Sequence, residues 1–355
     1  MSKYFSEKFN GLQAYVPGEQ PKDVQYVKLN TNELPFAPPK SVVQAMQTAG
    51  AGTNLYSDPT CSALVESAAK VLGVKPTQIL PTNGSDEILN FAFMAFCDEK
   101  TPAVFADLTY GFYSVFADLH RVEKKIIPLT DDFSIDPAQY FQAGGTVFIA
   151  NPNAPTGKAL TRAQVEEIVK NNPDNVVVID EAYVDFGGET CLPLIDKYDN
   201  LLITRTFSKS GGLAGARLGL GIASESLIAD LNIIKYSTNP YNVNAVTMAA
   251  GVAALHELDH YKKVRDIIVK NRMYTAEKLK AMGFAVLPSQ TNFLFIKSDE
   301  ISGEELYQKL KERGVLVRHF KGERTSAYNR VSIGTLRQMD AFLTAVRRIL
   351  TEKKA

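Results

Sequence analysis

Three side chains with a clear chemical use follow short apolar runs in this 355-residue sequence. Asp180 ends the run VVVID, and Lys209 follows the run LLITRTF. Arg217 comes eight residues after that lysine, beyond a glycine-rich stretch. A lysine flanked by small residues suits a Schiff base with a carbonyl compound. A neighbouring acid could hold a protonated ring nitrogen, and an arginine could bind a phosphate.

A second phosphate-binding element is indicated by the segment NGSDEIL. Gly84, Ser85 and Asp86 stand where a helix is expected to begin. The first N–H groups of a helix have no partner inside it, so they favour an anion. The lysine, the acid, the arginine and this helix start are together what a protein needs to bind pyridoxal phosphate.

The elements that must position these residues are short strands alternating with helices. Apolar runs bounded by turns predict buried strands at 103–107, 146–150, 176–180 and 201–207. Helical stretches such as SDEILNFAFMAFC and TRAQVEEIVKNN lie between them. This alternation predicts an α/β fold with a mostly parallel sheet covered by helices on both faces. Ligands bind at the carboxyl ends of the strands of such a sheet, so the side chains should meet there.

The chain divides into three parts by pattern. Residues 1–40, rich in proline, asparagine and aromatics, predict an extended N-terminal arm. Residues 41–240 predict the large cofactor-binding domain, and residues 241–355 a smaller α+β domain that packs with part of the arm. The smaller domain begins with a long helical pattern over 244–282, with a break expected near Asp259.

Composition excludes several classes of protein. The chain has 39 Lys+Arg and 39 Asp+Glu, and 45% of its residues are hydrophobic. It is therefore neither a disordered chain nor a basic nucleic-acid binder. No apolar run approaches the ~18 residues of a membrane span, and no secretory signal is visible. The three cysteines lack a C-x-x-C spacing, which predicts inert thiols in the cytoplasm and no metal site.

Longer motifs resemble a known family. NPNAPTG, DEAYVDF and TRTFSKSGGLAGARLG resemble the fold-type I pyridoxal-phosphate aminotransferases. AYVPG, LNTNELP, NLYSDP, NGSDE and TYGFY, with the later GVLVRHF and NRVSIGT, resemble the histidinol-phosphate aminotransferase family. The resemblance covers nearly the whole chain. It implies a large domain with a mostly parallel sheet and a smaller α+β C-terminal domain.

The resemblance assigns a cofactor role to each matching residue. Lys209 would bind the cofactor covalently and later carry a proton. Asp180 would pair with the ring nitrogen, Tyr183 would hydrogen-bond the ring oxygen O3′, and Tyr110 would stack on the ring. The phosphate would be held at the helix start by Gly84, Ser85, Asp86, Thr206, Ser208 and Arg217.

Two further cofactor contacts depend on the resemblance alone. The wider class has asparagine immediately before Pro-Thr-Gly, where this chain has Ala154. Either Asn153 substitutes for it, or Tyr183 acts nearly alone. Tyr56 would reach the cofactor phosphate of a neighbouring subunit, which implies a homodimer with shared active sites.

The resemblance also implies the substrates and how they bind. Arg330 would face the carboxylate of glutamate or the phosphate of histidinol phosphate, since a planar guanidinium suits both. Arg318, Tyr15 and Asn32 would complete this anion pocket. Amino transfer between glutamate and imidazole acetol phosphate would follow a ping-pong course. The stretch KGERTSAY (321–328) is more charged than the resemblance predicts, which leaves the substrate open.

Several alternatives stay open at this point. An aromatic amino acid aminotransferase or a threonine-phosphate decarboxylase would use the same cofactor residues. A regulator on the same scaffold is disfavoured, because no extra DNA-binding domain is visible. His256 and His260 match the zinc-protease pattern H-E-x-x-H, but such a short pattern arises easily by chance. Without the resemblance, Tyr110 and Tyr183 would be interpreted as packing aromatics.

Overall fold

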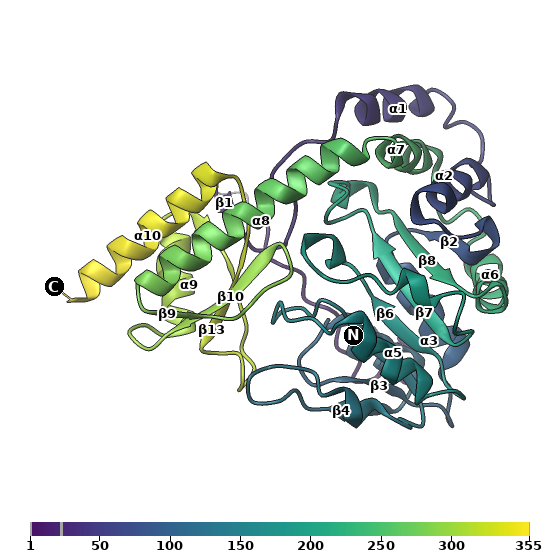
Figure 1. Ribbon diagram of the computed structural model, residues 1–355, viewed down its shortest axis with the longest axis horizontal. Coiled ribbons are helices and arrows are strands. Elements are labelled where there is room, and N and C mark those ends of the chain that lie inside the picture. The colour runs from purple at the N-terminus through teal and green to yellow at the C-terminus, as the bar shows by residue number, and fades with distance from the viewer. Residues whose placement is uncertain (1, 22–23, 355) are drawn as a thin grey trace.

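The computed structural model describes residues 2–21 and 24–354 (Figure 1). Residues 1, 22 and 23 of the predicted arm and residue 355 of the predicted small domain lie outside these ranges. The larger and the smaller sheet lie side by side in Figure 1, and the long helix α8 (Leu258–Ala281) runs obliquely above the smaller one.

The larger sheet has seven strands within the described residues, in the order β2-β8-β7-β6-β5-β3-β4. The pairs from β7 to β4 are all parallel, whereas β8 is antiparallel to β7 and β2. The predicted mostly parallel sheet is therefore confirmed. Its strands are β2 (Ile79–Thr82), β3 (Ala103–Ala106), β4 (Lys124–Ile127), β5 (Thr146–Ala150), β6 (Val177–Asp180), β7 (Leu201–Thr206) and β8 (Gly219–Ala223).

Both faces of this sheet are buried because its strands are apolar at successive positions. In β5, Val147 and Ile149 pack into one core cluster and Phe148 into the other. The first cluster is covered by α2 (Ser62–Leu72), α5 (Arg162–Lys170) and α7 (Ala245–Leu255). The second is covered by α3 (Ser85–Phe96), α4 (Phe112–His120) and α6 (Glu225–Thr238).

The helical pattern predicted over 244–282 forms two helices, α7 and α8, with the break at His256–Glu257. Helix α7 packs against α1 (Lys40–Gly50) and α2 beside the larger sheet. Helix α8 continues to the smaller sheet. The domain boundary near residue 240 stays a prediction.

Short 3₁₀ helices are η1 (Glu7–Phe9), η2 (Pro76–Gln78), η3 (Pro137–Tyr140), η4 (Val184–Phe186), η5 (Leu192–Leu194) and η6 (Ala214–Ala216).

The C-terminal part forms an antiparallel sheet packed against helices, as expected of an α+β unit. Its strand order is β12-β13-β10-β9. A separate parallel pair joins the N-terminal arm to this part of the molecule. The elements are β1 (Val27–Lys28), β9 (Phe284–Val286), β10 (Phe293–Ser298), α9 (Gly303–Glu312), β11 (Val315–Leu316), β12 (Arg318–His319), β13 (Tyr328–Ser332) and α10 (Leu336–Lys354).

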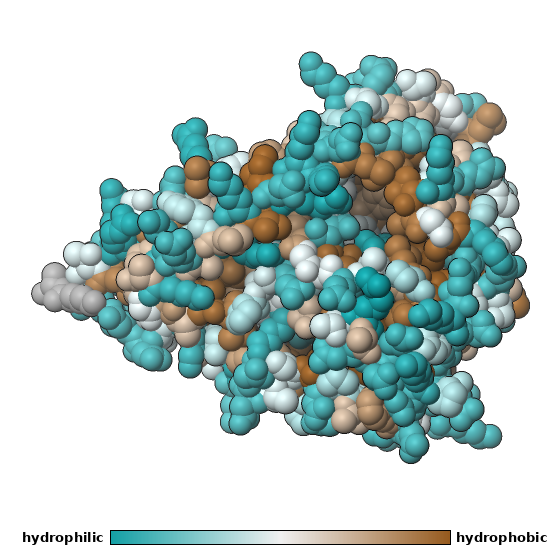
Figure 2. Space-filling view, viewed as in Figure 1, coloured by the Kyte–Doolittle hydropathy of each residue, from teal (hydrophilic) through white to brown (hydrophobic). Residues whose placement is uncertain are grey.

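Two further expectations concern the state of the thiols and membrane-spanning segments. Cys61, Cys97 and Cys191 are buried and free, and burial raises the pKa of the Cys61 thiol to about 11. The three thiols are thus buried, and the raised pKa disfavours the reactive thiolate at Cys61. No helix in the described part of the chain is long and apolar enough to cross a membrane. Figure 2 shows hydrophobic side chains gathered around a hollow beside α7.

Candidate active site

The carboxyl ends of β5, β6 and β7 and the start of α3 surround one cavity. This arrangement follows from the parallel register, in which Ala150, Asp180 and Thr204 lie side by side. Most of the predicted cofactor residues line the cavity. They are Ser85, Asp86, Tyr110, Asp180, Tyr183, Thr206, Ser208, Lys209 and Arg217.

One end of the cavity suits a phosphate. Gly84 caps the N-terminus of α3 with φ +79°, and a side chain there would meet Arg217 Nη2 at 2.6 Å. Arg217 donates from Nη1 to Ser208 Oγ (3.2 Å) and from Nη2 to Asp86 Oδ2 (3.0 Å). Its guanidinium, the serine hydroxyl and the first amides of α3 are the donors that a phosphate requires.

Asp180, the last residue of β6, supplies a carboxylate to the same cavity. It is 4% exposed, and its carboxylate accepts hydrogen bonds from Thr204 Oγ1 (2.9 Å) and Tyr113 OH (3.2 Å). Burial nevertheless raises the pKa of Asp180 to about 6. A buried carboxylate of this kind is stabilised by a nearby cation. A protonated pyridine nitrogen supplies one, so the acid and the phosphate donors together fit pyridoxal phosphate.

Removing the Asp180 charge should change the pH dependence of stability of the cofactor-free protein. The folded state holds the Asp180 proton more tightly than the unfolded state, so its stability falls as pH rises from about 4 to 6. A pKa raised by about two corresponds to roughly 3 kcal/mol. Denaturant unfolding should therefore show Asp180→Asn gaining about that much over wild type between pH 4 and 7. A difference in unfolding free energy between the two proteins that stays constant with pH would contradict this prediction. Bound cofactor should make that difference smaller.

Lys209 and Tyr183 meet where the cavity widens. Lys209 Nζ donates to the Thr31 carbonyl (3.3 Å) and lies 5.6 Å from the centre of the Tyr183 ring. The Tyr183 hydroxyl accepts a hydrogen bond from Asn32 Nδ2 (2.9 Å). Asn32 is fixed in turn by Ser332, which donates to Asn32 Oδ1 (2.9 Å). The arm and β13 together thus orient the tyrosine.

A wider cavity of about 500 Å³ continues from Lys209 and Tyr183. The predicted substrate residues Tyr15, Asn32, Arg318 and Arg330 all line it. Arg330 Nη2 donates to the Asn30 carbonyl (3.0 Å), but its buried Nε has no hydrogen-bond partner, and burial lowers the pKa of Arg330. No carboxylate of the described chain forms an ion pair with Arg318 or Arg330. The cavity therefore presents positive charge that an anionic ligand would neutralise.

Comparison with known proteins identifies the family. Residues 24–346 match the family described as aminotransferase class I and II. The chain is 45% identical to the histidinol-phosphate aminotransferase of Brachyspira hyodysenteriae, over 99% of both chains. It is 43% identical to histidinol-phosphate aminotransferase 1 of Bordetella parapertussis, over 99% of this chain and 100% of that one. The chain belongs to the histidinol-phosphate aminotransferase family, within the class I and II aminotransferases.

The fold of this aminotransferase agrees with a solved structure. The histidinol-phosphate aminotransferase of Sinorhizobium meliloti, solved in complex with pyridoxal-5'-phosphate, superposes with a TM-score of 0.89. That likeness covers 99% of both chains at 24% identity, so it speaks for the fold. The fold-type I architecture is confirmed, and family membership makes this chain a pyridoxal-phosphate-dependent aminotransferase.

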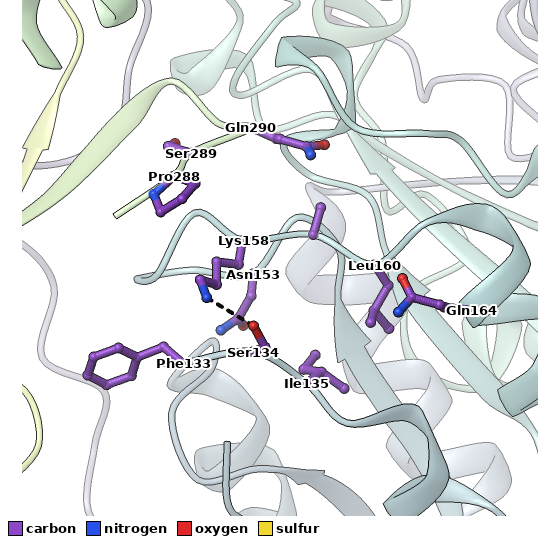
Figure 3. Close-up of a pocket in the computed structure, with 11 residues that line it drawn as sticks. Phe133, Ser134, Ile135, Asn153, Lys158, Leu160, Gln164, Pro288, Ser289 and Gln290 are labelled. Carbon is purple, nitrogen blue, oxygen red and sulfur yellow. Dashed lines mark hydrogen bonds between the residues drawn. The ribbon is translucent and has the colours of Figure 1, made fainter. Parts of the chain in front are cut away.

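Asn153 of this aminotransferase does not line the cofactor cavity. Its Nδ2 donates to the Leu108 carbonyl (3.0 Å), and its Oδ1 accepts from Thr109 Oγ1 (2.9 Å). It lines a separate cavity of about 350 Å³, where its side chain lies near those of Lys158 and Ser134 (Figure 3). These contacts do not support a cofactor role for Asn153.

The position next to Asn153 is the one that faces the cofactor cavity. Ala154 lines it and has no side-chain group that could donate to O3′. The contacts therefore favour the alternative in which Tyr183 acts nearly alone, with Asn32 holding its hydroxyl.

Tyr56 also lies outside both cavities of its own chain. Its side chain is 84% exposed and stacks on Tyr241, with ring centres 4.5 Å apart. The structure brings Tyr56 near none of the other predicted site residues. Any contact between Tyr56 and the cofactor would therefore require a second subunit.

Two partners of Asp180, Thr204 and Tyr113, were missed by sequence reasoning. Thr204 lies inside a strand that reads as purely structural, and only the strand register shows that it stands beside Asp180. Tyr113 lies in α4, one turn beyond Tyr110. The motif TYGFY carries both tyrosines, but sequence alone does not tell which of them faces the acid.

The H-E-x-x-H motif does not form a metal site. His256 is the C-cap that follows α7 and His260 belongs to α8, so the two histidines do not share a helix. No group of three His, Cys, Asp or Glu side chains in residues 2–21 and 24–354 could hold a metal ion. Nothing here supports the zinc-hydrolase alternative.

Proposed function

We propose that this chain is a histidinol-phosphate aminotransferase of histidine biosynthesis. It transfers an amino group reversibly between glutamate and imidazole acetol phosphate. The observation that carries the proposal is the guanidinium of Arg330, whose buried Nε has no hydrogen-bond partner, in a cavity shared with Lys209. Relatives that are 43–45% identical and bear the name of this activity support it.

The bound pyridoxal phosphate supplies an electron-withdrawing ring that stabilises negative charge at the substrate Cα. Lys209 Nζ would hold the cofactor through its aldehyde carbon and would later move the proton of the substrate Cα. Asp180 would keep the ring nitrogen protonated, and Tyr183 would donate to the ring oxygen. Tyr110 stacks on the ring, with its hydroxyl held by Asp86 Oδ1 at 2.7 Å.

The phosphates of cofactor and substrate are held by separate groups. Arg217, Ser208, Thr206 and the first amides of α3, which follow Gly84, hold the cofactor phosphate. Arg330 binds the anionic group of either substrate through a planar pair of donors. Arg318 adds positive charge, and the backbone carbonyls of Val16 and Pro17 hold its guanidinium (both 3.2 Å). Tyr15 closes the cavity from the arm.

Comparison of histidinol phosphate with histidinol tests this proposal. The two compounds differ only in the phosphate that Arg330 would bind. Charge-assisted hydrogen bonds contribute about 1.5–3 kcal/mol each, so kcat/KM should be at least about 10²-fold higher for the phosphorylated compound. Equal rates for the two compounds would refute a phosphate subsite in this cavity.

We further infer that the enzyme works as a homodimer. Leu55 and Tyr56 are 72% and 84% exposed, an unusual state for adjacent large apolar side chains. The apolar cavity beside α7 includes Leu255 and Leu258 and adds to the uncovered apolar surface (Figure 2). A partner subunit would cover such surfaces and would place its Tyr56 at this chain's cofactor phosphate. The buried free thiols agree with a cytosolic location.

Mixed dimers should reveal whether Tyr56 is shared between subunits. Tyr56→Ala and Lys209→Ala are each expected to have little activity alone. A heterodimer of the two contains one site with both defects and one intact site. Refolding an equal mixture should therefore restore about a quarter of wild-type activity. A mixture no more active than its components would show that Tyr56 acts in its own chain or not at all.

A further inference from the structure

Both substrate-binding arginines lie on one β-hairpin. β12 and β13 pair antiparallel, with Arg318 directly opposite Arg330. The charged stretch that follows Phe320 forms the loop between the two strands. The placement of both guanidinium groups relative to the cofactor therefore depends on where this hairpin loop is fixed.

Arg324 fixes the loop to the far side of the cavity. Its Nη1 donates to Asp107 Oδ2 (2.7 Å) and the Leu129 carbonyl (3.1 Å). Its Nη2 donates to the Thr130 carbonyl (2.7 Å). The guanidinium also lies over the Phe133 ring, 5.1 Å from its centre. A guanidinium with three acceptors and a ring beneath it is held more firmly than an isolated surface ion pair.

Asp107 directly precedes a wall of the substrate cavity. It follows β3 directly and begins the loop that carries Leu108 and Tyr110, both of which line that cavity. Its second carboxylate oxygen accepts from the Leu129 amide (2.9 Å), so its orientation is fixed from both sides. The Arg324–Asp107 pair thus joins the arginine hairpin to the loop that bears the cofactor-stacking tyrosine.

Aromatic packing continues the connection to the anion pocket. Phe133 contacts Tyr328 edge-on, with ring centres 5.4 Å apart, and Tyr328 stacks on Phe295 at 4.5 Å. Phe295 contacts Phe320 at 6.0 Å. The Phe320 ring lies 5.7 Å from the Arg330 guanidinium carbon. Movement of the hairpin loop would therefore displace the ring on which this substrate arginine rests.

We propose that Arg324 is a positioning residue for substrate binding. Through Asp107 and the two carbonyls it sets the separation between the anion-binding arginines and the cofactor. The inference rests on the proposed function, in which those arginines bind the substrate anion. It also gives the charged 321–328 stretch a role that a neutral turn could not fulfil.

Kinetics of loop variants in the cofactor-loaded enzyme test this role. Arg324→Ala should raise KM for both glutamate and histidinol phosphate by about 10-fold and change kcat less than about 2-fold, since it weakens binding and leaves the chemistry intact. Arg324→Lys keeps the charge but cannot reach all three acceptors, so its KM values should fall between those of the wild type and those of Arg324→Ala. Asp107→Asn should resemble Arg324→Ala, and the double variant should be no worse than either single one.

A matched control separates positioning from stability. Arg313, the C-cap of α9, forms an ion pair with Glu352 of α10 and donates to the Lys309 carbonyl, and its side chain is similarly exposed. Arg313→Ala should leave both KM values unchanged. An unchanged KM in folded Arg324→Ala would overturn the positioning role of Arg324. If that variant does not fold, an unchanged KM in Arg324→Lys and Asp107→Asn would overturn it. Wild-type enzyme that converts glutamate but not histidinol phosphate would refute the proposed substrate instead. The KM for glutamate in the Arg324 variants would then still test the positioning role.

Discussion

Replacing Lys209 with alanine is expected to abolish amino transfer, with a loss of at least about 10³-fold in kcat. Lys209 is the one lysine that lines the cofactor cavity among the described residues, and its Nζ approaches Tyr183 and Thr31 from the end of β7. No other amine there could hold the cofactor aldehyde or move the Cα proton. Stopped-flow absorbance of the cofactor after addition of glutamate would measure the loss.

A chemical measurement adds a second readout for Lys209. Borohydride reduction of the wild-type enzyme should increase its mass by covalently attached cofactor, and the alanine variant should show no increase. Lys75→Ala is the control, because it removes an exposed ion pair with Glu225 far from the cavity. Turnover by Lys209→Ala at the rate of the control would contradict the assignment of the cofactor lysine.

Replacing Arg330 with alanine should lower kcat/KM for histidinol phosphate by about 10²–10³-fold. The side chain is half-buried, its Nε is buried without a partner, and the only side-chain hydrogen bond that the structure records for it is to the Asn30 carbonyl. The anion would supply the missing acceptors. Because Lys binds as a point charge, Arg330→Lys should recover only part of the loss.

The same variant should lose discrimination between substrates. Histidinol lacks the phosphate, so its slow conversion should change little when Arg330 is replaced. The ratio of kcat/KM for the two compounds should therefore collapse towards one. An equal loss for both compounds would place Arg330 in the structure of the cavity instead of in contact with the phosphate.

The sequence was most informative where chemistry coincides with the end of a strand. Asp180 and Lys209 were recognisable because each ends an apolar run, and parallel strands bring such ends to one edge. Gly84 and Ser85 were recognisable as a helix start. Short-range patterns of this kind determine local structure, so the local sequence was enough to predict the cavity they line.

Long-range contacts could not be predicted in this way. Asn32 was assigned to the substrate anion, but its amide binds Tyr183, which is 151 positions away. Arg324 and Asp107 are separated by 217 positions, and nothing in either segment indicates the other. Asn153 shows that a local motif can also mislead. It stands one position before Ala154, and its side chain lines a separate cavity, whereas Ala154 lines the cofactor cavity.

This cavity is expected to process a phosphorylated amino donor by amino transfer. Single-turnover spectroscopy of the cofactor-loaded enzyme tests it, with histidinol phosphate, threonine phosphate and phenylalanine added separately. Rapid conversion of the cofactor to its amine form by histidinol phosphate, and by neither of the others, is the predicted result. Faster conversion by phenylalanine, or release of carbon dioxide from threonine phosphate, would contradict it.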